Sequence, residues 1–140
     1  MNRVTKISAG LVLGLFIATA LAIFPVAAAA QTLDISIESE TGGSPPGELT
    51  LTDPSGDRTG PEARDIHLSN PMSGLYNLKV NGRKTGVYLL ILKAYTASGS
   101  TSDVRFPHMN IKAGEVHHYD VNFSAEGPKL DVRRTRVTPE

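Results

Sequence analysis

Apolar and polar residues alternate along much of the chain beyond residue 31. Leu33, Ile35 and Ile37 are each followed by a polar residue. Leu49 and Leu51 repeat this pattern, with a threonine after each of them. Because successive side chains leave a β-strand on opposite faces, a period of two predicts strands that bury one face against a core.

The same reasoning predicts most of the remaining strands, which are separated by turns rich in glycine, proline, serine and aspartate. Further strands are expected over 66–68, 75–80, 87–95, 104–109 and 116–123. Pro107 has no N–H to donate to a neighbouring strand, so its strand is expected at a sheet edge. Residues 57–65 contain charges, glycine and proline and are expected to form an irregular connection.

Two of these strands share a short repeated pattern. Gly-x-Tyr-x-Leu-x-aliphatic occurs at 74–80 and again at 86–92. Asn81-Gly82 lies between them and is a common hairpin turn, so we expect these two strands to pair as a hairpin. The second strand is apolar on both faces, which predicts a position in the middle of the packed structure.

The strand pattern also indicates the fold class. No segment beyond Gln31 has apolar residues at sustained helical spacing. About seven short strands, with a turn about every 8–12 residues, are typical of an antiparallel β-sandwich. The sequence therefore predicts an all-β domain over 31–124, immunoglobulin-like or jelly-roll-like, with 125–140 as a C-terminal tail or a last strand.

Residues 1–30 have the features of a secretory signal peptide. Arg3 and Lys6 supply positive charge, 7–24 is an uncharged and mostly apolar helical segment, and the alanines at 28–30 are small. That order is the one that a signal peptidase requires. We therefore expect export to the periplasm or the medium of a bacterium.

The alternative is that the apolar segment stays as a membrane anchor, because its length is at the short end of a membrane span. Cleavage after Ala30 is favoured by the small residues before it and would give a mature chain that starts at Gln31. No membrane span is expected after cleavage.

Composition and charge exclude several functions. The chain has no cysteine, so thiol nucleophiles, iron–sulfur clusters, thiolate zinc sites and disulfides are excluded. It has 14 basic and 14 acidic residues. A nucleic-acid-binding protein needs an excess of basic residues on one face to neutralise phosphates, so no nucleic-acid partner is expected.

Residues 53–60, Asp-Pro-Ser-Gly-Asp-Arg-Thr-Gly, have the form D-P-x-G-x-R-x-G, and the two Gly-x-Tyr-x-Leu strands follow them. In this the chain resembles a β-sandwich accessory module of exported bacterial proteins, similar to pre-peptidase C-terminal and immunoglobulin-like domains. The resemblance covers roughly 49–124. It implies an exported, non-catalytic binding module, and it supplies no active-site residues.

Two sets of residues are candidates for a metal site. Asp53 and Asp57 lie in a glycine-containing loop with oxygen atoms spaced as some calcium ligands are. The alternative is that Asp53 caps a turn. His108 and His117 could hold copper or zinc if their strands pair, although His118 then points to the opposite face. The alternative is that these histidines lie on the surface.

Two functions from different classes remain. The first is a binding module without catalytic activity or cofactor, which contacts a protein or glycan through its loops at 41–47, 57–65 and 97–102 or through an edge strand. The second is a periplasmic protein that binds calcium, copper or zinc and also uses His67. No Gly-x-Ser-x-Gly motif is present, so an enzyme is not expected. The basic residues Arg133, Arg134 and Arg136 are candidates for contact with an anionic surface, or simply a solvated charge cluster.

Overall fold

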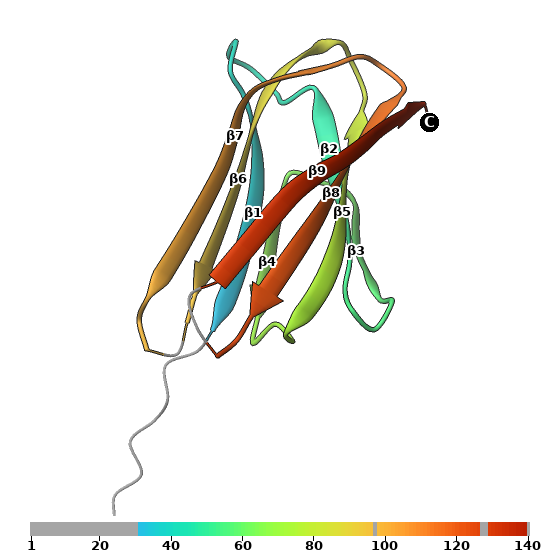
Figure 1. Cartoon of the computed structure of the whole chain (residues 1–140). Helices are drawn as coiled ribbons and strands as arrows, with labels where there is room; N and C mark the ends of the chain where they lie inside the picture. Colours follow the sequence, from blue (N-terminus) through green and yellow to red (C-terminus); the bar gives the residue numbers. More distant parts are fainter. Residues whose placement is uncertain (1–30, 97, 127–128, 140) are drawn as a thin grey trace, which may run out of the picture.

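The computed structural model describes residues 31–96, 98–126 and 129–139, and the predicted signal segment 1–30 lies outside them. The described residues form nine strands and no helix, as Figure 1 shows. The strands are β1 (Thr32–Ser39), β2 (Gly47–Thr52), β3 (Arg58–Ala63), β4 (Asp65–Ser69), β5 (Gly74–Gly82), β6 (Gly86–Tyr95), β7 (Thr101–Ile111), β8 (Glu115–Ser124) and β9 (Lys129–Pro139). No helix in this part of the chain is long and apolar enough to cross a membrane.

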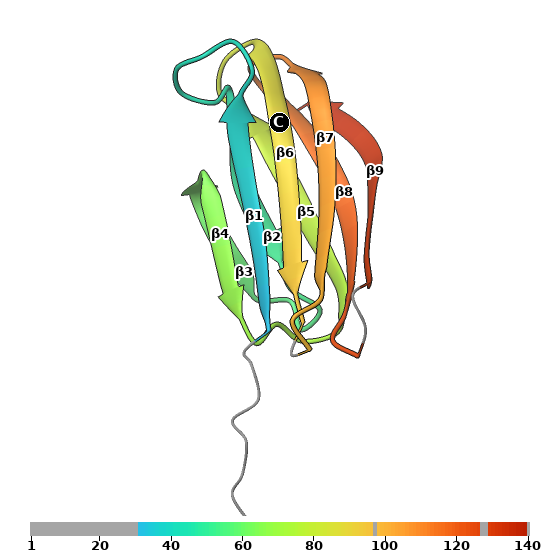
Figure 2. The same cartoon turned by 90° about the vertical axis from the view of Figure 1, so that its left-hand side faces the viewer.

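The strands form two antiparallel sheets that face each other, so the predicted all-β sandwich is confirmed. One sheet has four strands in the order β4-β1-β6-β7, and the other has five in the order β3-β2-β5-β8-β9. Figure 2 shows the four-stranded sheet in front of the five-stranded one. The sheets hold together because each strand of an amphipathic sheet has one apolar face to bury.

The core between the sheets comes from the alternation seen in the sequence. On β1, the inward side chains Leu33, Ile35 and Ile37 are buried, whereas the residues between them are only half-buried. The facing sheet contributes Tyr76 and Leu78 from the middle of β5, both with about 1% exposure or less. Burial of side chains of this size stabilises a fold by about 1.5–3 kcal/mol each.

The predicted hairpin between 75–80 and 87–95 is wrong. β5 pairs with β2 and β8, whereas β6 pairs with β1 and β7 in the other sheet. The chain crosses the sandwich at this point, and the backbone N–H groups of Arg83 and Lys84 both donate to the carbonyl of Pro46. Tyr76 and Tyr88, which the repeated pattern aligns, therefore enter the core from opposite sheets.

Three other expectations change. The segment 57–65 is not irregular, because it contains β3 and the start of β4. Of the two alternatives for the C-terminal segment, the structure shows the strand, and β3 and β9 together raise the number of strands from about seven to nine. The outward side chains of β6, such as Leu89 and Ile91, are half-buried, so this strand is central in its sheet but not enclosed on both faces.

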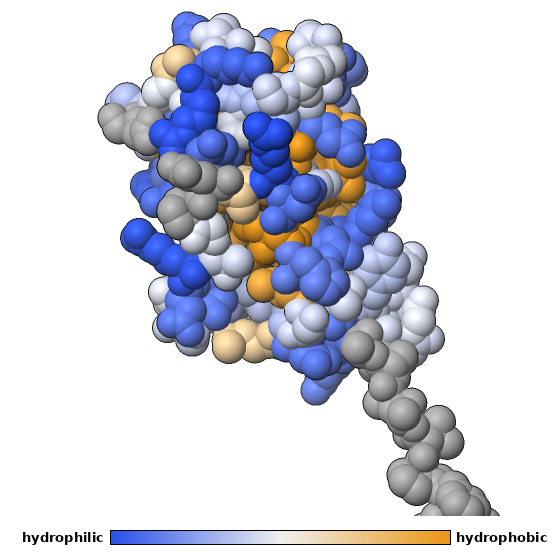
Figure 3. Space-filling model, turned by 180° about the vertical axis from the view of Figure 1, so that it is seen from behind, coloured by the Kyte–Doolittle hydropathy of each residue, from blue (hydrophilic) through white to orange (hydrophobic). Residues whose placement is uncertain are grey.

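Each sheet has two edge strands, so the sandwich has two sides at which an edge strand of one sheet lies beside an edge strand of the other. We call these the open sides. At one side, β3 and β4 lie at the ends of their sheets, and apolar surface shows between hydrophilic side chains (Figure 3). Ala63 and Leu68 are among the partly buried apolar residues there. At the other side, β7 and β9 approach each other, and both are eleven residues long.

Glycine is required where β5 ends. A Cβ on Gly82 would lie 2.3 Å from the carbonyl oxygen of Lys112, a backbone atom that cannot move alone. We expect Gly82→Ala to lower the free energy of unfolding by about 3 kcal/mol, because overpacking a tight site forces the backbone to shift. Chemical denaturation of the mature chain measures this.

Gly99→Ala is the control for this substitution. Gly99 has a φ of +83° and no atom within 4 Å of the added Cβ. Its substitution is expected to cost only the left-handed backbone strain of about 1–2 kcal/mol. Equal losses for the two variants would contradict the role of the close approach at Gly82.

Candidate functional site

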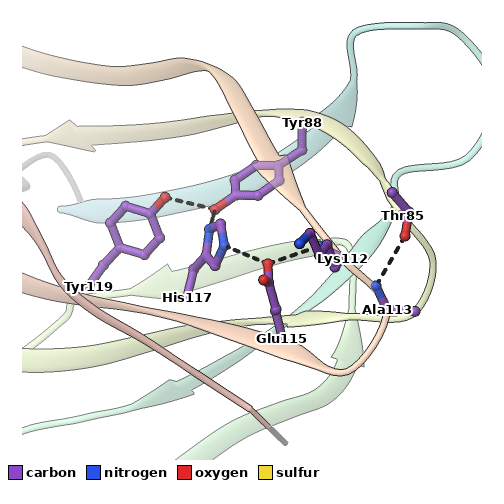
Figure 4. Close-up of polar contacts among 7 residues, drawn as sticks. All are labelled: Thr85, Tyr88, Lys112, Ala113, Glu115, His117 and Tyr119. Carbon is purple, nitrogen blue, oxygen red and sulfur yellow. Dashed lines mark hydrogen bonds and ion pairs between the residues drawn. The ribbon is translucent and has the colours of Figure 1, made fainter.

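A hydrogen-bonded cluster of three aromatic residues lies inside the apolar core. The hydroxyl of Tyr88 is 2.7 Å from Nδ1 of His117 and 2.7 Å from the hydroxyl of Tyr119 (Figure 4). All three side chains are buried, with exposures of 2% or less. We call these three residues the Tyr–His cluster.

The strand pattern places this cluster where the two sheets face each other. His117 and Tyr119 are two residues apart on β8, so both point into the core. Tyr88 comes from β6 in the opposite sheet. The expectation that the histidines lie on the surface is therefore wrong for His117, because it shares the inward face of Tyr119.

Glu115 connects the cluster to the surface. Its carboxylate lies 3.6 Å from Nε2 of His117 and accepts a hydrogen bond from the backbone N–H of Lys112 (Figure 4). Glu115 and Lys112 also line a surface cavity of about 370 Å³ with Thr85. The half-buried carboxylate of Glu115 thus lies between the buried cluster and the surface cavity.

Burial determines the charge state of the cluster. Desolvation lowers the pKa of His117 below 6.5, the nearby Arg134 lowers it further, and Glu115 opposes both effects. Desolvation also raises the pKa of Tyr88 and the pKa of Tyr119 above 10. Because desolvation outweighs the effect of Glu115, the cluster is neutral at neutral pH.

One proton arrangement satisfies every member of the cluster when His117 is neutral. With its proton on Nε2, facing Glu115, the Nδ1 atom accepts from Tyr88, and Tyr88 accepts from Tyr119. Protonation of Nδ1 would remove that acceptor and reverse the direction of the chain. This agrees with the finding that no buried side-chain nitrogen or oxygen in the described residues, those of the cluster included, lacks a partner.

The predicted calcium loop is a closed turn. Oδ1 of Asp53 accepts hydrogen bonds from the backbone N–H of Ser55, the hydroxyl of Ser55 and the backbone N–H of Asp57. The bond from the Ser55 hydroxyl is the main cause of the lowered pKa of Asp53. Asp57 itself is exposed. The capping role that was the alternative for Asp53 is confirmed by these contacts.

His108 on β7 forms two hydrogen bonds with the carboxylate of Glu40, which lies after β1. Its backbone N–H and Nδ1 lie 3.0 and 2.7 Å from the two oxygens of Glu40. His108 has a φ of +57°, and the register of β6 against β7 shifts beside it. The carboxylate therefore holds a left-handed residue at a β-bulge next to Pro107.

His67 lies on the outer face of the four-stranded sheet. Its ring contacts Asp34 of β1 through Nδ1, and the hydroxyl of Ser69 is 3.4 Å from Nε2. This is the order of contacts found in a Ser–His–Asp triad. However, the His67 side chain is 62% exposed, and the backbone N–H that follows Ser69 already donates to the carbonyl of Gln31. That N–H is not free to stabilise an oxyanion.

The structure does not bring the predicted metal ligands together. His108 is on β7 and His117 is on β8, and these strands belong to different sheets. His118 is half-buried on the other face of β8, with Nε2 2.8 Å from the hydroxyl of Thr138. Among the described residues, no group of three or more histidine, aspartate or glutamate side chains could hold a metal ion.

Sequence reasoning left 125–140 as either a tail or a last strand, and the structure shows the strand β9. It pairs only with β8, and residues 133–137 are exposed on both of its faces. The register shifts between His118 and Tyr119, so that Thr135 is an extra residue on β9. The apolar residues at 130, 132 and 137 were a signal for this strand, but the arginines between them obscured it.

No family model, curated protein or solved structure matches the chain. The resemblance to exported accessory modules therefore stays a prediction.

The buried histidine makes stability depend on pH in a defined direction. Because the pKa of His117 is lower in the folded state than the ordinary value of 6.5, the unfolded chain binds more protons as the pH falls. The contribution of this residue is fully present above pH 6.5 and decreases as the pH falls through the folded-state pKa. We expect His117→Gln to reduce the slope of unfolding free energy against pH below 6.5.

His118→Gln is the matched comparison. The pKa of His118 is also lowered, first by desolvation and then by Arg136 and Lys79. Because His118 is more exposed than His117, its replacement is expected to change the slope less. Denaturant titrations at several pH values measure both slopes, and an unchanged slope in His117→Gln would count against a neutral buried imidazole.

Proposed function

We propose that the protein is an exported, non-catalytic binding module that takes its partner along a free edge of the sandwich. The observation that carries this proposal is the pair of eleven-residue edge strands, β7 and β9, on one open side. An edge strand presents unpaired backbone N–H and C=O groups, which are a template for another strand.

The contacts of the polar candidates support a role in binding more than a role in chemistry. Asp53 closes a turn, Glu40 holds a bulge, and the Tyr–His cluster is buried and internally satisfied. The triad-like contacts of His67 lie on an open, exposed surface. Among the described residues, the metal-binding alternative is supported only by pairs of potential ligands, such as His67 with Asp34.

Export is the second part of the proposal, and the mature terminus tests it. Gln31 donates its side-chain amide to the carbonyl of Ala125, and its own carbonyl accepts from Asn70. Cleavage after Ala30 would leave both contacts intact. We expect mass spectrometry of the protein from the periplasm or medium to give a chain that starts at Gln31; a full-length chain in the membrane fraction would favour the anchor.

A photo-crosslinking amino acid at the edges tests where the partner binds. We expect Thr101 on β7 or Arg133 on β9, when replaced by the photo-crosslinker, to give a discrete adduct in the cells that produce the protein. Both side chains are exposed on strands at sheet ends.

Asn122 is the control position for this experiment. It is exposed, but it lies on β8, which has a strand on each side. A discrete adduct from Asn122 alone, or no adduct from either edge, would overturn binding along an edge.

A further inference from the structure

The two free edges differ in how well they can accept another strand. β7 contains Pro107, which has no N–H, and His108 with its left-handed backbone. Both features are devices that protect an edge from pairing. β9 has no proline between Lys129 and Thr138, and its one irregularity is the extra residue at Thr135. The β9 edge is therefore the better acceptor.

The inner face of β9 leaves apolar surface beside β7. Val132 is half-buried and Val137 is 47% exposed, both on the face that continues the inward face of β8. Across the open side, β7 presents the half-buried Phe106 and Met109, which pack against the core. A further strand with apolar side chains on its inner face would cover more of these residues.

The charge of β9 indicates the chemistry of that strand. Over 129–139 the strand has four basic residues and one acidic residue, Asp131. Arg133 lies 3.3 Å from Asp131, whereas Arg134 and Arg136 have no carboxylate partner among the described residues. Arg134 is close enough to the core for its charge to lower the pKa of His117.

Two of these arginines share the outer face of the sheet. Arg133 is opposite Asp120 and Arg136 is opposite His118, and both of these β8 residues point away from the core. If two copies of β9 paired antiparallel with Arg133 opposite Arg136, like charges would lie side by side. Such a pair is destabilising, so self-pairing of β9 in this register is disfavoured.

We propose that β9 accepts an extended acidic segment of another protein as a sixth strand of its sheet. Backbone groups of the segment pair with the free edge of β9. Carboxylates on its outer face meet Arg133 and Arg136, and apolar side chains on its inner face lie against Val132 and Val137. The proposal rests on the proposed function and names the class of partner for one of the two edges.

Binding of a designed peptide to the mature chain tests this. The probe is a fluorescein-labelled peptide of five Val-Glu repeats, which alternates as the proposed segment does. We expect saturable binding by fluorescence anisotropy that weakens as salt is added, because exposed charge pairs are screened. A Val-Lys peptide, and an acidic peptide with proline in place of alternate valines, are expected not to bind.

The variants separate β9 from the other edge. The double variant Arg133→Glu, Arg136→Glu is expected to bind the Val-Glu peptide at least tenfold more weakly. The control Arg105→Glu reverses an exposed charge on β7 and is expected to bind as the original protein does. Circular dichroism of each variant checks that it is folded, and the peptide comparisons test the proposal without any variant.

Each result has a defined meaning. No binding of the Val-Glu peptide, equal binding of the proline peptide, or equal loss in Arg105→Glu would overturn the acidic strand at β9. If an edge crosslinks a partner in cells and the peptide does not bind, this inference fails while the proposed function stands. If neither edge crosslinks, the proposed function fails whatever the peptide does.

Discussion

The structure depends on the burial of one alternating apolar face from each sheet. No disulfide is available to a chain without cysteine, so the core must stabilise the fold alone. The largest fully buried side chains, Tyr76, Tyr88, Tyr119 and Phe123, come from β5, β6 and β8, which lie inside their sheets. The strands at the sheet ends contribute fewer buried side chains to this core, such as Ile66 of β4, Ile111 of β7 and Leu130 of β9.

This constraint also explains the polar cluster in the core. A tyrosine ring fills a large volume of the core, but its hydroxyl needs a hydrogen-bond partner when it is buried. Tyr76 reaches the carbonyl of Met72 at one end of the sandwich, whereas Tyr88 and Tyr119 meet between the sheets and share His117. A network of this kind favours one packing arrangement, because a slipped register would leave its members unpaired.

The fold class could be predicted from the sequence because period-two alternation is a local signal that each strand carries independently. The pairing of strands could not, since Asn81-Gly82 has the composition of a hairpin turn but ends β5, and residues 83–85 then cross to the other sheet. His117 was considered only as a metal ligand or a surface histidine, although its position in β8 pointed inward. The partners Glu40 and Asp34 were unpredictable, because they come from other segments of the chain. The edge position of β7 could be predicted from Pro107 and is confirmed, whereas the edge position of β9 could be seen only once the strand order was known.

The crossing between β5 and β6 has a consequence for how the chain folds. These two strands are neighbours in sequence, yet each finds its partners among strands that lie far along the chain, such as β8 for β5 and β1 for β6. To form contacts of this kind the chain must close large loops, which costs conformational entropy before any contact stabilises the fold. Such topologies therefore fold slowly, in about milliseconds to seconds. During synthesis, one side of β5 has no strand to pair with until β8 has been made. Slow folding of this kind is compatible with the export proposed above, because a chain must be unfolded while it passes through a narrow translocation channel.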